Sequence, residues 1–200
     1  MAEGKTTAAD LGADVCFADG AGQGPRPPRG RRWAPRGCTP VFRVRGGGRG
    51  WVSVAGVLCV RPGARAHLLY RLRLWRGRAG ERRGFAWTDY RDLMVWTHLR
   101  LGAPLVWVWD NLNVHATGGL RAFIAENERW LRVFRLPCYA PDLNPTEGVW
   151  SLLERSVANL AATNLDHLVR VVKRKLKKIQ YRSHLLEGCL AETGLALETP

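Results

Sequence analysis

The sequence predicts a single mixed α/β domain, and three observations support this fold class. The chain has 200 residues, of which 46% are apolar, so it can bury a sizeable core and is too apolar to be disordered over most of its length. Its first half contains several short segments with strand-like composition. Its second half alternates helical and strand-like patterns, as expected for a sheet with helices packed on it.

The first half is expected to form strands. Residues 15–18 are a short buried-strand candidate that ends at Asp19. Residues 41–45 and 51–60 are rich in β-formers and are separated by glycines, which predicts a hairpin. Residues 67–75 alternate apolar side chains with Arg, which predicts a third strand with one face in water.

The second half is expected to alternate. A helix is predicted over residues 85–101 and a buried strand over residues 104–109, the latter followed directly by Asp110. A second helix is predicted over 120–130 and a further strand over 131–136.

Two helices are expected near the C-terminal end. The first begins at Asn144, with Asn at the cap, Pro145 at the first helical position and Glu147 placed to close a capping box. The second has apolar residues at helical spacing between 165 and 179. Its other face carries basic residues, by default a solvated surface and alternatively a contact for DNA: Arg170, Lys173, Arg174, Lys175, Lys177, Lys178 and Arg182.

Charge is the first indication of a partner. The chain has 31 basic and 17 acidic residues, and its net charge of +14 favours binding to a polyanion such as nucleic acid. A genome whose base composition favours Arg codons is the alternative explanation. Residues 26–49 contain eight arginines and no acid, and their prolines and glycines predict an extended, turn-rich loop. The arginines expected to contact DNA there are Arg26, Arg29, Arg31, Arg32 and Arg36.

Other classes are disfavoured. No apolar stretch is long enough to span a membrane, and the N-terminal residues do not have the pattern of a secretory signal, so a cytoplasmic protein is expected. Five cysteines without Cys-x-x-Cys spacing argue against a disulfide framework or a zinc site.

Three acidic residues are candidates for chemistry. Asp19 and Asp110 each follow an apolar strand, and Glu147 lies in the first turn of a predicted helix. If the two strands are neighbours, both aspartates reach one edge of the sheet. Three carboxylates at one place would repel each other unless a cation neutralised them, and oxygen ligands of this kind suit Mg²⁺ or Mn²⁺.

Each of these acids also has an ordinary explanation. An Asp after a strand commonly forms a turn or caps a helix, and Glu147 could do no more than complete a capping box. Trp107 and Trp109 are expected in the core rather than as platforms for stacked bases. Spacing alone does not decide between these interpretations.

The residues around the acids resemble a known family. Residues 108–115 read Val-Trp-Asp-Asn-Leu-Asn-Val-His, and residues 139–147 read Tyr-Ala-Pro-Asp-Leu-Asn-Pro-Thr-Glu. Both are similar to the second and third acidic motifs of DDE transposases, in the branch of bacterial insertion-sequence transposases related to the mariner elements. The 36 residues between Asp110 and Glu147 fit the spacing of this family. Residues 17–19, with the Arg-rich segment that follows, resemble its first motif.

This resemblance implies a ribonuclease H-like fold: a mixed sheet flanked by helices, with a C-terminal basic amphipathic helix. It implies metal-dependent DNA cleavage and strand transfer, with Asp19, Asp110 and Glu147 as catalytic ligands of Mg²⁺ or Mn²⁺, two ions being expected. Asn111 and His115 would support the site or contact DNA. Asn144 and Pro145 would aim Glu147 at the metals from the start of the helix.

The resemblance also implies partners and an organisation. The expected partners are double-stranded DNA at the element ends and target, a second copy of the chain, and an upstream helix-turn-helix half. A place at the nucleoid would follow. The expected division is a tail over 1–13, the catalytic domain over 14–182 and a second tail over 183–200.

Two departures from the family pattern are visible. Relatives usually have a second acidic residue directly after the first catalytic Asp, where this chain has Gly20. Only eighteen residues precede Asp19, too few for a helix-turn-helix region. The chain therefore resembles a catalytic domain alone, and the rival hypotheses are an inactive DNA-binding remnant and a structure-specific nuclease of the same fold.

Overall fold

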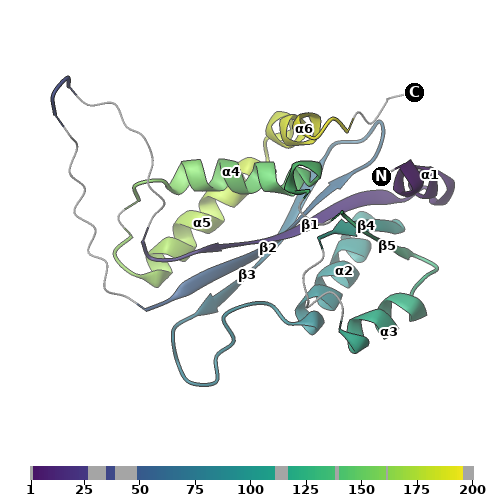
Figure 1. Ribbon diagram of the computed structural model, residues 1–200, viewed down its shortest axis with the longest axis horizontal. Helices are drawn as coiled ribbons and strands as arrows, with labels where there is room; N and C mark the ends of the chain where they lie inside the picture. Colours follow the sequence, from purple (N-terminus) through teal and green to yellow (C-terminus); the bar gives the residue numbers. More distant parts are fainter. Residues whose placement is uncertain are drawn as a thin grey trace.

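The computed structural model describes residues 2–26, 35–38, 49–110, 117–137, 140–160 and 162–195. At its centre is a five-stranded sheet with the strand order β3-β2-β1-β4-β5 (Figure 1). The strands are β1 (Asp14–Gln23), β2 (Trp51–Val60), β3 (His67–Trp75), β4 (Leu105–Trp109) and β5 (Leu131–Arg135). The expectation of one mixed sheet flanked by helices is confirmed.

The sheet has an antiparallel and a parallel half. Strands β2 and β3 run antiparallel to their neighbours, whereas β4 and β5 run parallel to β1. The parallel half needs a crossover before each strand, and α2 (Trp87–Leu101) and α3 (Gly118–Glu126) supply these connections. Strand β1 is the central strand and is shared by both halves.

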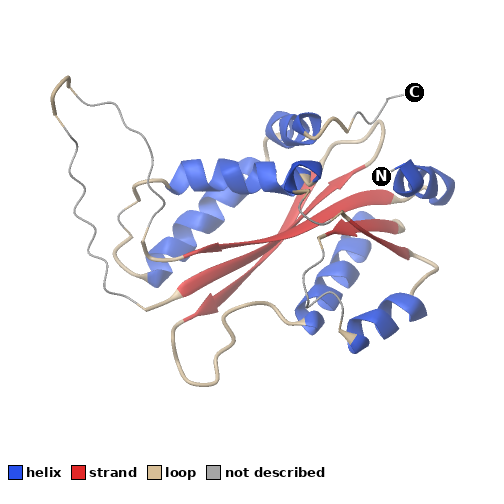
Figure 2. Ribbon diagram, in the orientation of Figure 1, coloured by secondary structure: helices blue, strands red, loops and turns tan. Residues whose placement is uncertain are grey.

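Helices cover both faces of the sheet (Figures 1 and 2). Helices α4 (Pro145–Val157), α5 (Leu165–Gln180) and α6 (Ser183–Glu192) lie on one face, and α2 and α3 lie on the other. A short 3₁₀ turn, η2 (Pro141–Leu143), precedes α4, and α1 (Ala2–Leu11) packs beside β1 and β4.

The alternation of side chains along β1 divides the core into two layers. Val15 and Phe17 belong to the layer beneath α4, α5 and α6. Cys16 and Ala18 belong to the layer beneath α2 and α3. The same alternation places the next residue, Asp19, on the α4 face.

Most predicted elements form, with shifts at their ends. Strand β1 does not stop at Asp19 but continues to Gln23, because β2 offers a pairing partner along this whole stretch. The expectation that Asp19 follows the strand is therefore wrong, and with it the interpretation of Asp19 as a turn former. Helix α3 ends at Glu126, earlier than predicted, and a turn at 127–130 leads into β5.

Two predicted features cannot be compared directly. The predicted strand over 41–45 lies outside the described residues, as does most of the Arg-rich segment.

At the C-terminal end, α6 packs against α4 and α5, with Leu186 and Cys189 buried. A search of the described residues finds no helix long and apolar enough to cross a membrane.

Candidate catalytic carboxylate site

The strand register brings Asp19 and Asp110 to the same level. The last pair between β1 and β4 is Phe17 with Val108, and each aspartate lies two residues beyond its member of this pair. Phe17 and Val108 both face the α4 layer, and the alternation of side chains carries this orientation forward by two residues. Because the strands run parallel, the two carboxylates lie at one edge, as the sequence predicts for neighbouring strands.

Helix α4 is fastened to β1 next to Asp19. The hydroxyl of Thr146 donates a hydrogen bond of 2.7 Å to the carbonyl oxygen of Phe17, and the Asn144 amide donates one of 3.4 Å to that of Ala18. The Asn144 side chain also accepts from the backbone N–H of Thr146 at 3.2 Å, which confirms the predicted helix cap. All of these groups are buried. The start of α4 is thus held one residue before the first aspartate.

This anchoring places Glu147 beside Asp19. Glu147 is close enough to Asp19 for a hydrogen bond between the two carboxyl groups when one of them is protonated, and Glu147 is otherwise exposed. The predicted capping box is not what the structure has, since the backbone N–H of Asn144 donates to the carbonyl oxygen of Pro141 at 2.8 Å. The Glu147 carboxyl therefore faces the aspartates rather than the helix cap.

A tryptophan holds the Asp19 carboxylate in place. The indole N–H of Trp150 donates a hydrogen bond of 3.0 Å to Oδ2 of Asp19, and the backbone N–H of Gly20 donates one of 2.7 Å to Oδ1. The Trp150 ring reaches this position by lying across Gly56, the residue of β2 that pairs with Asp19. A Cβ atom at Gly56 would come within 2.5 Å of the ring. The glycine is thus required by the ring's close approach.

The electrostatics of the site reflect crowded negative charge. Burial, foremost, and then the charge of Glu147 raise the pKa of Asp19 from 3.8 to about 7. The hydrogen bonds from Gly20 and Trp150 oppose this rise, and the charge of Asp110 adds to it. The pKa of Glu147 is also raised, mainly by burial and further by Asp110, against the lowering effect of its bond with Asp19. The Asp19 and Glu147 carboxyl groups therefore both sense the charge of Asp110.

Tyr90 of α2 lies close to the same charges from the opposite face. Burial and then the charges of Asp110 and Asp19 raise its pKa to about 12, so its hydroxyl stays protonated. A Cβ atom built on Gly20 would lie 3.7 Å from this hydroxyl, an ordinary contact. Position 20 thus has room for a Cβ atom.

The carboxylate oxygens of the site suit a hard divalent cation, but the groups are spaced too widely to hold one as they stand. Carboxylate oxygens are the ligands that Mg²⁺ and Mn²⁺ prefer, and a cation would relieve the repulsion that adds to the effect of burial on the pKa of Asp19. Within the part of the chain that the structure describes, no three carboxylate, imidazole or thiolate groups are gathered closely enough to hold an ion.

The remaining predicted site residues are distributed as follows. Arg26 and Arg36 are exposed, and Lys173, Arg174, Lys177 and Lys178 are exposed on α5. Pro145 occupies the first position of α4. Five predicted residues lie outside the described ranges: Arg29, Arg31, Arg32, Asn111 and His115.

Comparison with known protein families finds a match to part of this chain. Residues 90–169 match the model of the DDE superfamily endonuclease family. This region is similar to the DDE superfamily endonucleases. The matched region includes Asp110 and Glu147 and begins at Tyr90, and it confirms the DDE resemblance of the sequence motifs. None of the curated protein sequences matches the chain.

Solved structures show that the DDE region is part of a larger shared fold. The Mos1 strand transfer complex matches with a TM-score of 0.54 and 14% identity, over 92% of this chain and 56% of that one. The Mos1 mariner paired-end complex with Mn matches with a TM-score of 0.55 and 15% identity, over 92% and 56%. The paired-end complex with Mg gives 0.54 and 16%, over 92% and 57%.

At these identities the likeness concerns the fold, and the predicted ribonuclease H-like architecture is confirmed. This chain spans a little over half of the length of the transposase chains that it matches.

Sequence reasoning missed three residues that shape the site. Trp150 could have been found from its spacing, because it lies one helical turn after Glu147 and therefore on the same side of α4. Gly56 and Tyr90 had no local signal, since each comes close to Asp19 only through the pairing of strands or the packing of α2 on the sheet.

Proposed function

We propose that this chain is the catalytic domain of a bacterial insertion-sequence transposase related to the mariner elements. It cuts double-stranded DNA at the element ends and joins the freed 3′ end to target DNA. Asp19, Asp110 and Glu147 are the catalytic residues and the ligands of Mg²⁺ or Mn²⁺. The observation that supports this proposal is the placement of Asp19 and Asp110 at one edge of the sheet by the β1–β4 register, together with the anchoring of α4 that puts Glu147 beside Asp19.

Divalent ions at such a site, two by family resemblance, would activate the attacking oxygen and stabilise the departing one in phosphodiester chemistry. The similar Mos1 complexes include one with Mn and one with Mg, which supports the same choice of ion here. The chain's own residues fix the geometry. Trp150 orients the Asp19 carboxylate, and the bonds from Thr146 and Asn144 to β1 keep Glu147 beside it.

DNA is held by basic residues away from the carboxylates. Lys173, Arg174, Lys177 and Lys178 on α5 are exposed and would contact backbone phosphates, which positions DNA without reading its sequence. The arginines predicted for this role are Arg26, Arg29, Arg31, Arg32 and Arg36. Asn111 and His115 would support the site or contact DNA. The proposed partners also include a second copy of the chain and an upstream helix-turn-helix half, with nucleoid DNA as the site of action.

Nicking of supercoiled plasmid in Mn²⁺ tests the proposal, with the parent chain compared with Asp110→Asn. Supercoiled DNA supplies substrate without any need for end recognition. The parent is expected to nick and the variant to lose nicking by at least a hundredfold, because a neutral amide is a poor ligand for a hard cation. DNA affinity should be retained or increased when one negative charge is removed.

Equal nicking by both chains would exclude the carboxylate assignment. Absence of nicking by both, with salt-sensitive DNA binding retained, would favour the DNA-binding remnant as the function of this chain. Gly20, in place of the second acid of relatives, is the feature that makes this second candidate worth testing. A nicked product without any joined 3′ end would favour a structure-specific nuclease.

A further inference from the structure

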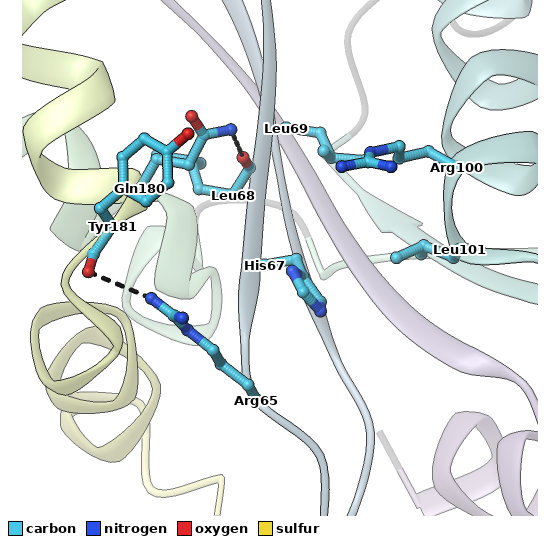
Figure 3. Close-up of a pocket in the computed structure, with 8 residues that line it drawn as sticks. All are labelled: Arg65, His67, Leu68, Leu69, Arg100, Leu101, Gln180 and Tyr181. Atoms are coloured by element: carbon cyan, nitrogen blue, oxygen red, sulfur yellow. Dashed lines mark hydrogen bonds between the residues drawn. The ribbon is translucent and has the colours of Figure 1, made fainter.

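A pocket opens at the edge of the sheet, away from the carboxylates, where β3 begins. It has a volume of about 420 Å³ and straddles the strand (Figure 3). Gln180 and Tyr181 at the end of α5 lie on one side of β3, and Arg100 and Leu101 at the end of α2 lie on the other. The remaining lining residues are Arg65, His67, Leu68 and Leu69.

The lining has the chemistry of an anion site. Two guanidinium groups and one imidazole line the pocket, and none of the lining residues is acidic. Arg65 and Arg100 are exposed and approach from opposite sides of the strand, whose Leu68 and Leu69 side chains are buried (Figure 3). A guanidinium group presents several donors in a planar fork that matches a phosphate. Tyr181 adds a hydroxyl and a ring that is 67% exposed.

The pocket continues the basic surface of α5. Arg170, Lys173, Arg174 and Lys177 lie at helical spacing on one exposed side that leads to Tyr181. The ammonium group of Lys177 lies 5.9 Å from the centre of the Tyr181 ring. The guanidinium of Arg65 donates a 3.1 Å hydrogen bond to the carbonyl oxygen of Tyr181. These two contacts link the helix surface to the pocket.

The length of this surface suits a duplex. One end of α5 is fixed by the ion pair of Asp166 with Arg76 at 2.7 Å, and the other by the 2.7 Å bond from Gln180 to the carbonyl oxygen of Leu68. Sixteen residues of helix extend about 24 Å, which corresponds to roughly seven base pairs at about 3.4 Å each.

We propose that this pocket binds backbone phosphates of the DNA duplex that runs along α5, with Arg65 and Arg100 as the phosphate ligands and Tyr181 beside them. The inference rests on the proposed function and extends its DNA path beyond α5 to the sheet edge. The bond from Arg65 to the carbonyl oxygen of Tyr181 could serve only to cap the end of α5. Such a cap does not explain why Arg100, from a different element, lines the same pocket.

The test measures DNA affinity over a series of salt concentrations for the full chain, using a duplex longer than the surface. The pocket variant is Arg65→Ala/Arg100→Ala, and the matched control is Arg121→Ala/Arg129→Ala, which removes two exposed arginines near the opposite edge of the sheet. Loss of two phosphate contacts should lower the slope of log affinity against log salt by about 2. Affinity at fixed salt should fall at least tenfold, and the control should stay within about twofold of the parent.

Arg100→Glu is a second variant that leaves the Arg65 bond intact, and it should weaken binding at least as much as Arg100→Ala does. Equal effects of the pocket and control pairs would overturn the proposal. A second contrary result would be a pocket variant that binds DNA as tightly as the parent but is no longer stabilised against unfolding by inorganic phosphate. That result would indicate a pocket for the free anion. The nicking comparison with Asp110→Asn is read separately, so failure of the catalytic assignment leaves the affinity result interpretable.

Discussion

Trp150 and Gly56 show how the position of one carboxylate depends on residues in other elements. The ring of Trp150 donates to Asp19 only because Gly56 leaves space for it in β2. The orientation of Asp19, a proposed metal ligand on β1, is therefore set by a hydrogen bond from α4 and by the lack of a side chain at Gly56 on the neighbouring strand β2.

Replacing Gly56 with Ala should damage the site, because the added Cβ would meet the Trp150 ring at 2.5 Å. Overpacking of this kind typically costs about 1–3 kcal/mol of unfolding free energy. Nicking should fall about tenfold or more as the indole moves away from Asp19. Plasmid nicking and thermal unfolding measure the two effects.

The matched control is Gly20→Ala, another glycine in the same pair of strands. A Cβ there lies 3.7 Å from the nearest atom and requires no displacement. Its nicking and stability should stay close to those of the parent. The same losses in both variants would contradict the role assigned to the Trp150 contact.

The raised pKa of Asp19 predicts how stability changes with pH. The folded chain holds this proton up to about pH 7, whereas the unfolded chain releases it near 4, so the folded state binds more protons between these values. Without divalent metal, the free energy of unfolding should therefore fall as pH rises through this window. Asp19→Asn should remove the fall and be more stable than the parent at pH 7 by about 1–3 kcal/mol.

Denaturant unfolding at several pH values between 4 and 8 provides the measurement. A parallel pH dependence of parent and variant would show that Asp19 does not carry the effect.

At the scale of elements, the start of α4 is the part of the molecule that assembles the site. The Thr146 hydroxyl and the Asn144 amide bond to consecutive carbonyl groups of β1, so the helix cannot slide along the strand without breaking them. The glutamate follows directly after these anchors.

Thr146→Val keeps the shape of the side chain but removes the donor to the Phe17 carbonyl oxygen. Leaving this buried oxygen without its bond should cost about 1–3 kcal/mol, and nicking should decrease because Glu147 is less well placed. Thr146→Ser keeps the hydroxyl and should retain most of the nicking activity. Equal nicking by the Val and Ser variants would mean that the anchor does not position the site.

Much of this arrangement follows from sequence patterns. The cap at Asn144 and the strands over 51–60 and 67–75 were predictable, because cap residues and β-branched runs act locally. The length of β1 was not, since its glycine-containing second half is a strand only because β2 pairs with it. For the same reason the Trp150, Gly56 and Tyr90 contacts to Asp19 depend on residues far apart in sequence.

At the scale of the whole molecule, the carboxylates and the basic surface occupy separate places. The carboxylates lie where β1 and β4 cease to pair, and the basic side of α5 ends at the pocket on the β3 edge. The mixed sheet connects them. Residues 67–69 of β3 pair with residues 57–59 of β2, and the same β2 residues pair with residues 16–18 of β1, directly before Asp19. DNA held at the pocket would therefore be held relative to the carboxylates by a continuous network of backbone bonds.

The central place of β1 has a consequence for the native-state dynamics of the site. Amide protons of a strand bonded on both sides exchange with solvent only through the larger unfolding events of a domain, whereas residues beyond the end of a strand exchange through small local openings. Residues 15–17 are paired with both β2 and β4, and Asp19 lies just beyond them, still paired with β2. Asp110 comes after the end of its strand and Glu147 in the first turn of its helix. Within the proposed site, Asp19 is thus the fixed reference, and adjustment to a changing substrate would fall to the other two acids.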